Sequence, residues 1–479
     1  MQSAEGKPLP FYEAVVGGRS VGAPGTVVML EAAHKQYGKL AWAALFQPAI
    51  RLAEDGFKVS ARLNTLLASE AHLKKDPVAA AYFYDVDGKA WPVGHVLKNP
   101  ALALVLKRIA RDGANAMRQG EIAQAIVDKV QKHPTNPGKL SLQDIASYQH
   151  KQRTPICTDY SAQNKNYQIC GMPPPSSGAI AVAQILGILG NTNAGNIAPE
   201  GDAPAAGWLH LYLEASRLAF ADRAQYLGDP DFVTAPAGDW NSLVAPDYLA
   251  ERAKLIGPAS MKTGKPGQPG AIKVAYGLGA DQPEYGTSHI SIIDGFGNAI
   301  SMTTTIEDAF GSRQMVNFGG GQGGFLLNNE LTDFNFAPND ADGKPTANRV
   351  QPGKRPRSSM APTLVLDKAT GQVVMSGGSP GGALIIHYTA KTLYGVLNWG
   401  LNTQQAINLP NFAATGAPTL LEEKRFSPAT VDYLKGKGHE VREQNMTSGL
   451  QAIERTSSPA GSGLFGGADP RREGVVMGD

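Results

Sequence analysis

The sequence is compatible with an α+β fold, because helical and strand patterns occupy different parts of the chain. Residues 1–150 read mostly as amphipathic helices, whereas the second half contains runs in which apolar and polar residues alternate, the period of a half-buried strand. The chain has 479 residues, among them 55 glycines and 33 prolines. This composition suits an enzyme with many ordered loops better than a helical bundle. The length allows two or three domains or one large layered structure.

Charge and hydropathy argue against two classes of protein. Lys and Arg number 44 against 42 Asp and Glu, which gives a formal net charge of +2. Since no basic run is interleaved with aromatic residues, the electrostatic footprint of a nucleic-acid binder is missing. No apolar segment approaches the roughly 20 residues of a membrane helix, and Met1–Lys7 lacks the charged and apolar regions of a signal peptide. We therefore expect neither a nucleic-acid partner nor insertion into a membrane.

Helical periodicity marks the elements that should cover a sheet. The glycine after Asp55 is a stop signal for one of these helices. Four histidines of this region, His34, His72, His95 and His133, occur singly without ligand spacing, so packing explains them better than chemistry. The predicted helices cover Val27–Tyr37, Ala41–Glu54, Asn99–Asp112, Gln119–Lys132, Leu142–Tyr148, Ala179–Leu189 and Trp208–Leu227.

The two cysteines lie in short β-like pieces on either side of a polar turn. Cys157 and Cys170 flank the turn Ser161–Asn166. Pairing across such a hairpin would suit disulfide geometry and would imply an oxidising compartment. Two free thiols are the alternative. A zinc site is less favoured, because no histidine and no second cysteine pair lies nearby.

A hairpin is predicted from residue 287 to residue 305. Two alternating runs are separated by the turn Asp294–Asn298, which is rich in turn-forming residues. Antiparallel pairing would bring Thr287 and Thr305 together at the open end, within reach of a hydrogen bond. Residues 257–286, which precede the hairpin, are rich in Gly, Pro and Lys and lack periodicity, so we expect an exposed and mobile segment there. The open end of the hairpin is where we expect chemistry.

Two further loops carry candidate polar groups. Ser176 and Ser177 precede a glycine, but the Gly-x-Ser-x-Gly pattern of a nucleophile elbow is absent, so we expect one of them to cap the following helix. Glu307, Glu330 and Asp333 cluster in sequence beyond the hairpin, where several carboxylates could grip a cationic group. Solvated loop acids are the alternative for any one of the three.

A glycine-rich loop joins a predicted strand to a predicted helix. The strand Val373–Ser376 leads into Gly377–Gly382, and the helix Ala383–Val396 follows. The loop matches neither the dinucleotide fingerprint nor the P-loop. It does supply unpaired backbone N–H groups at a helix start, which suit a developing negative charge. An oxyanion hole is one use of such a loop.

Four segments in this order resemble the γ-glutamyltranspeptidases, which are N-terminal nucleophile hydrolases. The resemblance extends over essentially the whole chain and implies a four-layer αββα sandwich. It also implies that the chain cuts itself before Thr287, giving a large subunit of residues 1–286 and a small subunit of residues 287–479 that share one fold. The segments are Gly286-Thr287-Ser288-His289, Phe325-Leu326-Leu327-Asn328-Asn329, Arg357-Ser358-Ser359-Met360-Ala361-Pro362-Thr363 and Gly378-Ser379-Pro380-Gly381-Gly382.

The resemblance also implies roles for individual residues and an acyl transfer without cofactor or metal. Thr287 would attack the γ-glutamyl amide of glutathione or a related compound, and its new α-amine, with a pKa of roughly 8, would act as the base. His289 would then be structural. The resulting ester would pass the γ-glutamyl group to water, an amino acid or a dipeptide. The other implied roles are a hydrogen bond to Thr287 (Thr305), the oxyanion hole (Gly381, Gly382), the α-ammonium site (Glu307, Glu330, Asp333) and the α-carboxylate site (Ser358, Ser359).

The sequence departs from the family pattern at its start. Family members carry a further segment before the position of Met1, with an arginine that binds the α-carboxylate, and Arg19 stands in a different context. We therefore expect a large subunit that is short at its N-terminus. The family and the possible disulfide imply a periplasmic or secreted protein. Two alternatives are an acylase of the same family acting on glutaryl or cephalosporin-type side chains, and an inactive uncleaved homologue with a binding or structural role.

Overall fold

The computed structural model describes residues 1–272, 274–279, 286–458 and 461–478. It divides into two compact units. The first unit comprises residues 1–152 and 305–332, and the second comprises residues 153–304 and 333–479. Among the described helices, none is long and apolar enough to cross a membrane.

The first unit is mainly helical. Its apolar side chains form two clusters, one around Ile122 and Ile126 and the other around Leu67 and Leu73. The predicted helix Ala41–Glu54 is in fact two helices, because Pro48 starts a new one in its first turn. The helices of this unit are α1 (Phe11–Val15), α2 (Thr26–Tyr37), α3 (Trp42–Leu45), α4 (Gln47–Asp55), α5 (Ala61–Ser69), α6 (Pro77–Phe83), α7 (Pro100–Asp112), α8 (Asn115–Arg118), α9 (Gly120–Gln131) and α10 (Leu142–Ser147), and its short strands are β1 (Phe57–Lys58), β2 (Val96–Leu97), β7 (Met315–Val316) and β8 (Phe325–Leu326).

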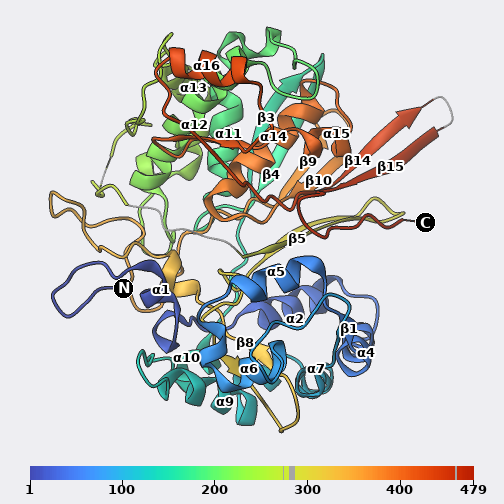
Figure 1. The fold of residues 1–479 in the computed structure, drawn as a ribbon. Coiled ribbons are helices and arrows are strands. Elements are labelled where there is room, and N and C mark those ends of the chain that lie inside the picture. Colours follow the sequence, from blue (N-terminus) through green and yellow to red (C-terminus); the bar gives the residue numbers. More distant parts are fainter. Residues whose placement is uncertain (273, 280–285, 459–460, 479) are drawn as a thin grey trace. The chain divides into compact units, whose positions relative to one another are not determined.

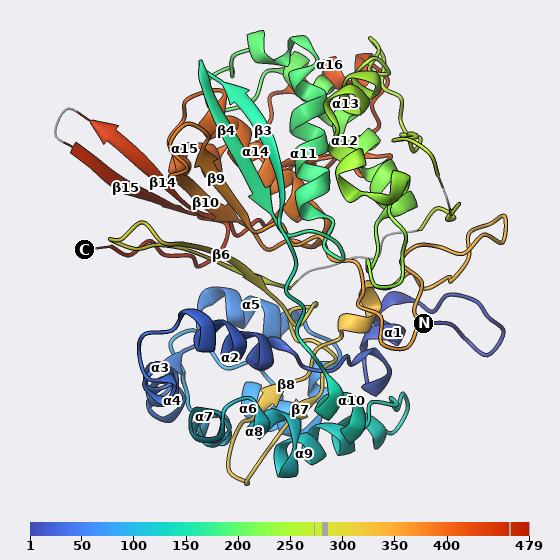
Figure 2. The same ribbon diagram turned by 180° about the vertical axis from the view of Figure 1, so that it is seen from behind.

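The second unit is built on a six-stranded antiparallel sheet in the order β15-β14-β10-β9-β4-β3. Helix α11 contacts β3 and β4, and α14 contacts β10, so these two helices form a layer on the sheet (Figures 1 and 2). The mixed α+β content agrees with the predicted class. The strands are β3 (Ile156–Ala162), β4 (Lys165–Gly171), β9 (Thr363–Asp367), β10 (Val373–Gly378), β14 (Gln451–Ser458) and β15 (Gly461–Ala468), and the helices are α11 (Gly178–Gly190) and α14 (Ile385–Leu397).

Further elements surround this sheet. Helix α12 packs on α11, and a three-stranded sheet has the order β11-β12-β13. Predicted and observed helices agree within three residues at each end for α11 and α12. The elements are α12 (Ala206–Tyr226), α13 (Pro246–Ala253), α15 (Thr403–Asn408), α16 (Pro428–Gly436), β11 (Phe412–Ala413), β12 (Thr419–Glu422) and β13 (Val441–Gln444).

The predicted hairpin is present as β5 (Ser288–Ile293) and β6 (Ala299–Thr304), and it packs on β9, β10 and β14. Its inward face is the polar one. Ser301 Oγ donates to Gly377 O (3.0 Å) and accepts from Thr363 N (2.9 Å), while Ser376 Oγ donates to Ile300 O (2.8 Å). The isoleucines of the other face are about half exposed. Small hydroxyls thus join the two layers because they pair with main-chain groups there.

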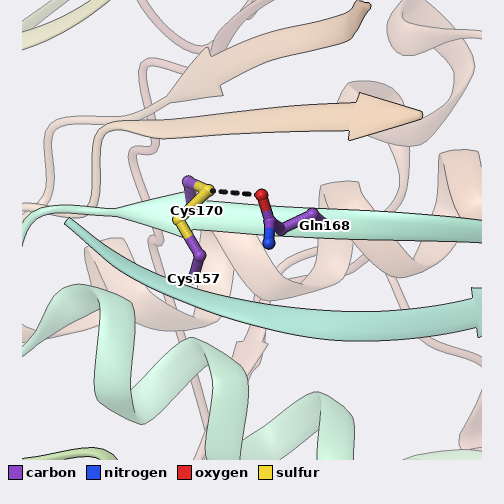
Figure 3. Close-up of a disulfide and its surroundings, with 3 residues drawn as sticks. All are labelled: Cys157, Gln168 and Cys170. Atoms are coloured by element: carbon purple, nitrogen blue, oxygen red, sulfur yellow. Dashed lines mark hydrogen bonds between the residues drawn. A yellow bond between two sulfur atoms is a disulfide. The ribbon is translucent and has the colours of Figure 1, made fainter. Parts of the chain in front are cut away.

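A disulfide joins Cys157 and Cys170, which are directly opposite each other on β3 and β4 (Figure 3). Their S–S distance is 2.06 Å. Gln168 on β4 lies beside the bridge, with its Oε1 3.8 Å from Cys170 Sγ. Strand β4 continues towards the start of α11, so the bridge braces the strand that leads into that helix.

The segment before the hairpin agrees with the prediction in part. Residues 257–272 contain no helix or strand, as expected, and several of their main-chain groups are hydrogen-bonded to α12. Met261 N donates to Glu214 (2.7 Å), Arg217 Nε donates to Lys262 O (2.8 Å), and Gly267 N donates to Asp222 (2.7 Å). The segment is attached through bonds between its main chain and charged side chains of α12. Its own side chains therefore need no apolar period. Most residues of 257–272 are exposed, as expected, although their main chain is hydrogen-bonded to α12, and residues 280–285 lie outside the described chain.

His387 makes the stability of the second unit depend on pH. Its ring is fully buried and stacks on Phe220 at 5.0 Å. Burial, with help from Arg217 and Arg223, lowers the pKa of His387 to about 3. Between pH 6.5 and 3 the unfolded chain therefore binds a proton that the folded chain excludes, and stability falls as the pH falls through this window.

We predict that His387→Phe, which keeps the ring and removes the titrating group, flattens this dependence. At pH 5 the wild type should lose about 2 kcal/mol of unfolding free energy through this residue, relative to neutral pH. Urea unfolding of both proteins at pH 7.5 and pH 5 measures the difference, and His150→Gln at an exposed position is the control. Equal pH dependence in wild type and His387→Phe would contradict the assignment.

Candidate active site

Thr287 directly precedes β5 and has a strained backbone. Its φ is +148°, in a region that residues with a side chain rarely adopt. Strain of this kind costs on the order of 1–3 kcal/mol and occurs often at functional sites. The side chain is half-buried, and the carbonyl oxygen accepts from Arg472 Nη1 at 3.5 Å. The backbone strain thus lies at the peptide bond where the sequence predicts cleavage.

The hairpin has the register that the predicted pairing of the two threonines requires. Ser288 is opposite Thr304 in the last pair of the β5–β6 ladder. Thr305 follows that pair and belongs to the first unit, where its Oγ1 accepts from Glu307 N at 2.8 Å. The hydrogen bond between Thr287 and Thr305 stays a prediction.

The loop after β10 presents two consecutive N–H groups. Gly381 and Gly382 have φ values of +137° and +61°, and they precede a 3-10 turn that leads into α14. Within the part of the chain that the structure describes, neither N–H has an acceptor. A Cβ at Gly381 would lie 2.6 Å from Cε2 of Tyr388, so only glycine fits. Donors of this kind are what an oxyanion hole requires.

His289 connects the strand of Thr287 to this loop. A Cβ on Gly378, the last residue of β10, would overlap the His289 ring. The ring nitrogens are hydrogen-bonded to Thr303 Oγ1 (2.8 Å) and Ser291 Oγ (3.1 Å), and burial lowers the pKa of His289 to about 4. His289 is therefore neutral at neutral pH and is bonded within its own hairpin. This geometry agrees with a structural role.

Ser358 and Ser359 are held by a buried arginine that the sequence analysis did not single out. Ser359 is fully buried, and its Oγ accepts from Arg223 Nη2 at 2.7 Å. Arg223 Nε donates to Ser177 Oγ (2.8 Å), which donates to Ser358 O (2.7 Å). Ser177 occupies the N-cap position of α11 without capping it, so that prediction was wrong for Ser177. Ser176 Oγ does accept from Gly178 N, at 3.4 Å.

The acidic residues lie on two neighbouring segments. Asn329 Nδ2 donates to Glu307 Oε2, and Asn329 Oδ1 accepts from Asp308 N at 3.0 Å. Asn329 thus ties Glu307 to the 3-10 turn Glu330–Asp333 that follows it. Asn329 was missed as a functional residue, although it closes one of the four family-like segments.

The predicted site residues divide between the two units. Thr305, Glu307 and Glu330 belong to the first unit. The second unit contains the remaining ones, Gly286, Thr287, Asp333, Ser358, Ser359, Gly381 and Gly382.

One group of potential metal ligands occurs among the described residues, namely His210, Glu214 and His439. Its ligand atoms are already in use. Glu214 Oε1 accepts from Arg217 Nη1 at 2.6 Å, and His210 Nδ1 lies 2.9 Å from His439 Nε2. A guanidinium at this distance would repel a cation. The group is better explained as a buried hydrogen-bond network between α12 and the segment before β13.

A mixed α+β fold, a threonine directly before a strand and a loop whose N–H groups have no acceptor in the described chain are compatible with the class of the N-terminal nucleophile hydrolases. The Gamma-glutamyltranspeptidase family model matches residues 1–479, and the chain belongs to this family.

Two curated relatives and one solved structure illustrate the similarity. The glutathione hydrolase proenzyme of Escherichia coli K12 is 35% identical over 461 residues, which are 94% of this chain and 73% of that protein. The acylase ACY 1 proenzyme of Pseudomonas sp. SE83 is 32% identical, over 97% of this chain and 76% of its own length. The crystal structure of a cephalosporin acylase from Bacillus halodurans superimposes with a TM-score of 0.81 at 26% identity, covering 98% of this chain and 80% of that one.

Proposed function

We propose that this protein is a self-cleaving γ-glutamyl acyltransferase and hydrolase whose nucleophile is Thr287. The observation that carries the proposal is the pair of N–H groups on Gly381 and Gly382, which have no acceptor in the described chain and lie in the unit that contains Thr287. Gly382 is buried, and a buried donor without an acceptor is costly unless a ligand uses it. Membership of the γ-glutamyltranspeptidase family supports an acyl transfer as that use.

Cleavage between Gly286 and Thr287 would create the base as well as the nucleophile. It gives a chain of residues 1–286 and a chain of residues 287–479, and it leaves a free α-amine on Thr287. That amine takes the hydroxyl proton as Oγ attacks the γ-carbonyl carbon. The Gly381 and Gly382 N–H groups stabilise the oxyanion, and Thr305 orients the hydroxyl. The amine then returns the proton to the leaving group, and a γ-glutamyl ester of Thr287 remains.

The second half of the reaction resolves this ester. Water or the amine of an amino acid or dipeptide attacks the ester carbonyl and gives its proton to the α-amine, which passes the proton to Thr287 Oγ as that oxygen leaves. Glu307, Glu330 and Asp333 bind the α-ammonium of the glutamyl group, and Ser358 and Ser359 bind its α-carboxylate. The strained backbone at Thr287 supports cleavage at that bond, since hydrolysis would release the strain.

We predict that the purified protein gives two bands on a denaturing gel, corresponding to residues 1–286 and 287–479. Thr287→Ala should remain a single chain, because it lacks the hydroxyl that attacks the preceding peptide bond. Ser288→Ala is the matched control, since Ser288 is exposed and adjacent, and it should be cleaved like the wild type. A persistent full-length band of wild type would instead support the inactive, uncleaved homologue.

An acylase for glutaryl-type side chains is the second candidate. The structural similarity to a cephalosporin acylase and the sequence similarity to acylase ACY 1 favour it. The acids Glu307, Glu330 and Asp333 argue against it, because a glutaryl group lacks the ammonium that would offset their charge.

We predict that kcat/KM for a γ-glutamyl anilide exceeds that for the glutaryl anilide by about 10- to 100-fold, the value of one hydrogen bond to a charged group. Asp333→Asn should reduce the ratio of the two kcat/KM values, because it lowers kcat/KM for the γ-glutamyl anilide only. Steady-state kinetics with both anilides measure it, and a ratio below one would favour the acylase.

We also propose a periplasmic or secreted location. The disulfide between Cys157 and Cys170 supports it, because disulfides persist mainly in oxidising compartments. Fractionation of cells that produce the protein tests this point, and recovery from the cytosol with reduced cysteines would contradict it.

A further inference from the structure

The loop that carries the free N–H groups contains one hydroxyl, and this hydroxyl controls the orientation of a peptide. Ser379 is fully buried, and its Oγ donates to the carbonyl oxygen of Pro380 at 2.7 Å. Ser379 Oγ itself accepts from the N–H of Gly449 at 3.2 Å. Both roles of the hydroxyl, as donor and as acceptor, are therefore filled by main-chain groups.

The bond to Pro380 fixes the direction of the Gly381 N–H. The Pro380–Gly381 peptide is trans, and in a planar trans peptide the C=O and N–H point in opposite directions. Because Ser379 holds the carbonyl on the buried side, the Gly381 N–H must point to the other side. Gly381 is partly exposed.

Without such a bond this peptide could turn over. Glycine adopts positive and negative φ about equally well. Gly381 therefore does little to prevent the Pro380–Gly381 peptide from rotating. The turned peptide would present the Pro380 carbonyl where the N–H now lies. A carbonyl oxygen there would repel the oxyanion instead of stabilising it.

We propose that Ser379 is a positioning residue of the oxyanion hole, whose hydroxyl keeps the Pro380–Gly381 peptide in the orientation that directs the Gly381 N–H to the substrate. This inference rests on the proposed function. It assigns to Ser379 no contact with the substrate.

The main chain of Gly449, which donates to Ser379, is fixed by further buried contacts. Gly449 packs so closely on Pro380 that a Cβ would lie 2.6 Å from Pro380 Cγ. The neighbouring Ser448 donates to Asp469 and accepts from Asn411 Nδ2 at 2.8 Å, and Lys391 donates to Asn411 Oδ1 at 2.9 Å. All these residues are buried. The Gly449 N–H is therefore held in place independently of Ser379.

The other side of this segment reaches Thr287. Arg472 donates to Thr447 O through Nη2 at 3.1 Å and to Thr287 O through Nη1 at 3.5 Å. Residues 447–449 thus lie between the main chain of Thr287 and the loop of Ser379.

The test compares Ser379→Ala with Ser216→Ala. Ser216 is an equally buried serine on α12 whose Oγ donates to Leu213 O (2.9 Å), so its loss imposes a similar structural cost away from the loop. For Ser379→Ala we expect kcat for a γ-glutamyl anilide to fall about threefold to tenfold, the population shift that one hydrogen bond provides, with KM unchanged. Ser216→Ala should keep both constants.

A pair of inhibitors separates positioning from general damage. Glutamate occupies the ground-state site, whereas a boronic acid with boron in place of the γ-carbonyl carbon gains a bond from Thr287 Oγ and becomes tetrahedral, the proton passing to the α-amine. Ser379→Ala should lower the affinity for the boronic acid by the same factor by which it lowers kcat, and it should leave the affinity for glutamate unchanged. Should Ser379→Ala fail to fold, Ser379→Cys, with its weaker donor, carries the same comparison.

Two results would overturn the proposal. One is a Ser379→Ala protein whose kcat and boronic acid affinity stay within twofold of wild type. The other is an equal loss of glutamate and boronic acid affinity. In both cases an active wild type would leave the proposed function intact. A wild type that turns over neither γ-glutamyl nor glutaryl anilides would refute the proposed function and this proposal with it.

Discussion

The packing of His289 against Gly378 is the contact on which the candidate site depends. It joins the strand that Thr287 opens to the end of β10, from which the loop with Gly381 and Gly382 continues. Only glycine leaves room for the ring at this point, and the ring is fixed by hydroxyls of its own hairpin. A neutral, buried histidine therefore acts here as a spacer between two layers, and its low pKa follows from that burial. The free α-amine expected on Thr287 makes a second base unnecessary.

Hydrogen bonds also fix the position of the β5–β6 hairpin on the neighbouring sheet. The layers of most sandwiches meet through apolar side chains. Here Ser301 and Ser376 bond to main-chain groups of the facing layer, so the position of the hairpin is specified by directed bonds as well as by contact. Directed bonds favour one register and one orientation. For a strand that has to place a nucleophile, such specification matters more than the additional stability that apolar packing would give.

Local patterns in the sequence were sufficient for the elements and for part of the site. The helices α2, α7, α9, α11 and α12 and the strands β5 and β6 follow from periodicity and from turn residues, and the glycine loop is visible as a strand-to-helix connection. The break between α3 and α4 was missed although Pro48 signals it. The bonds of 257–272 to α12 could not be predicted, since they join main-chain groups to Glu214, Arg217 and Asp222 without any repeat. The contacts of Arg223 and Ser379 were also missed, because each side chain holds a neighbouring group of the protein, although Ser379 lies in one of the four family-like segments.

The central claim is that Thr287 becomes a chain terminus and carries the acyl group. The most direct measurement is peptide mapping by mass spectrometry after the protein has been mixed with a γ-glutamyl anilide and rapidly denatured in acid. The account predicts a peptide that begins at Thr287 and carries the mass of one γ-glutamyl group as an ester, which hydroxylamine removes. A peptide that runs uncleaved through Gly286 and Thr287, or an acyl group on another residue, would contradict it.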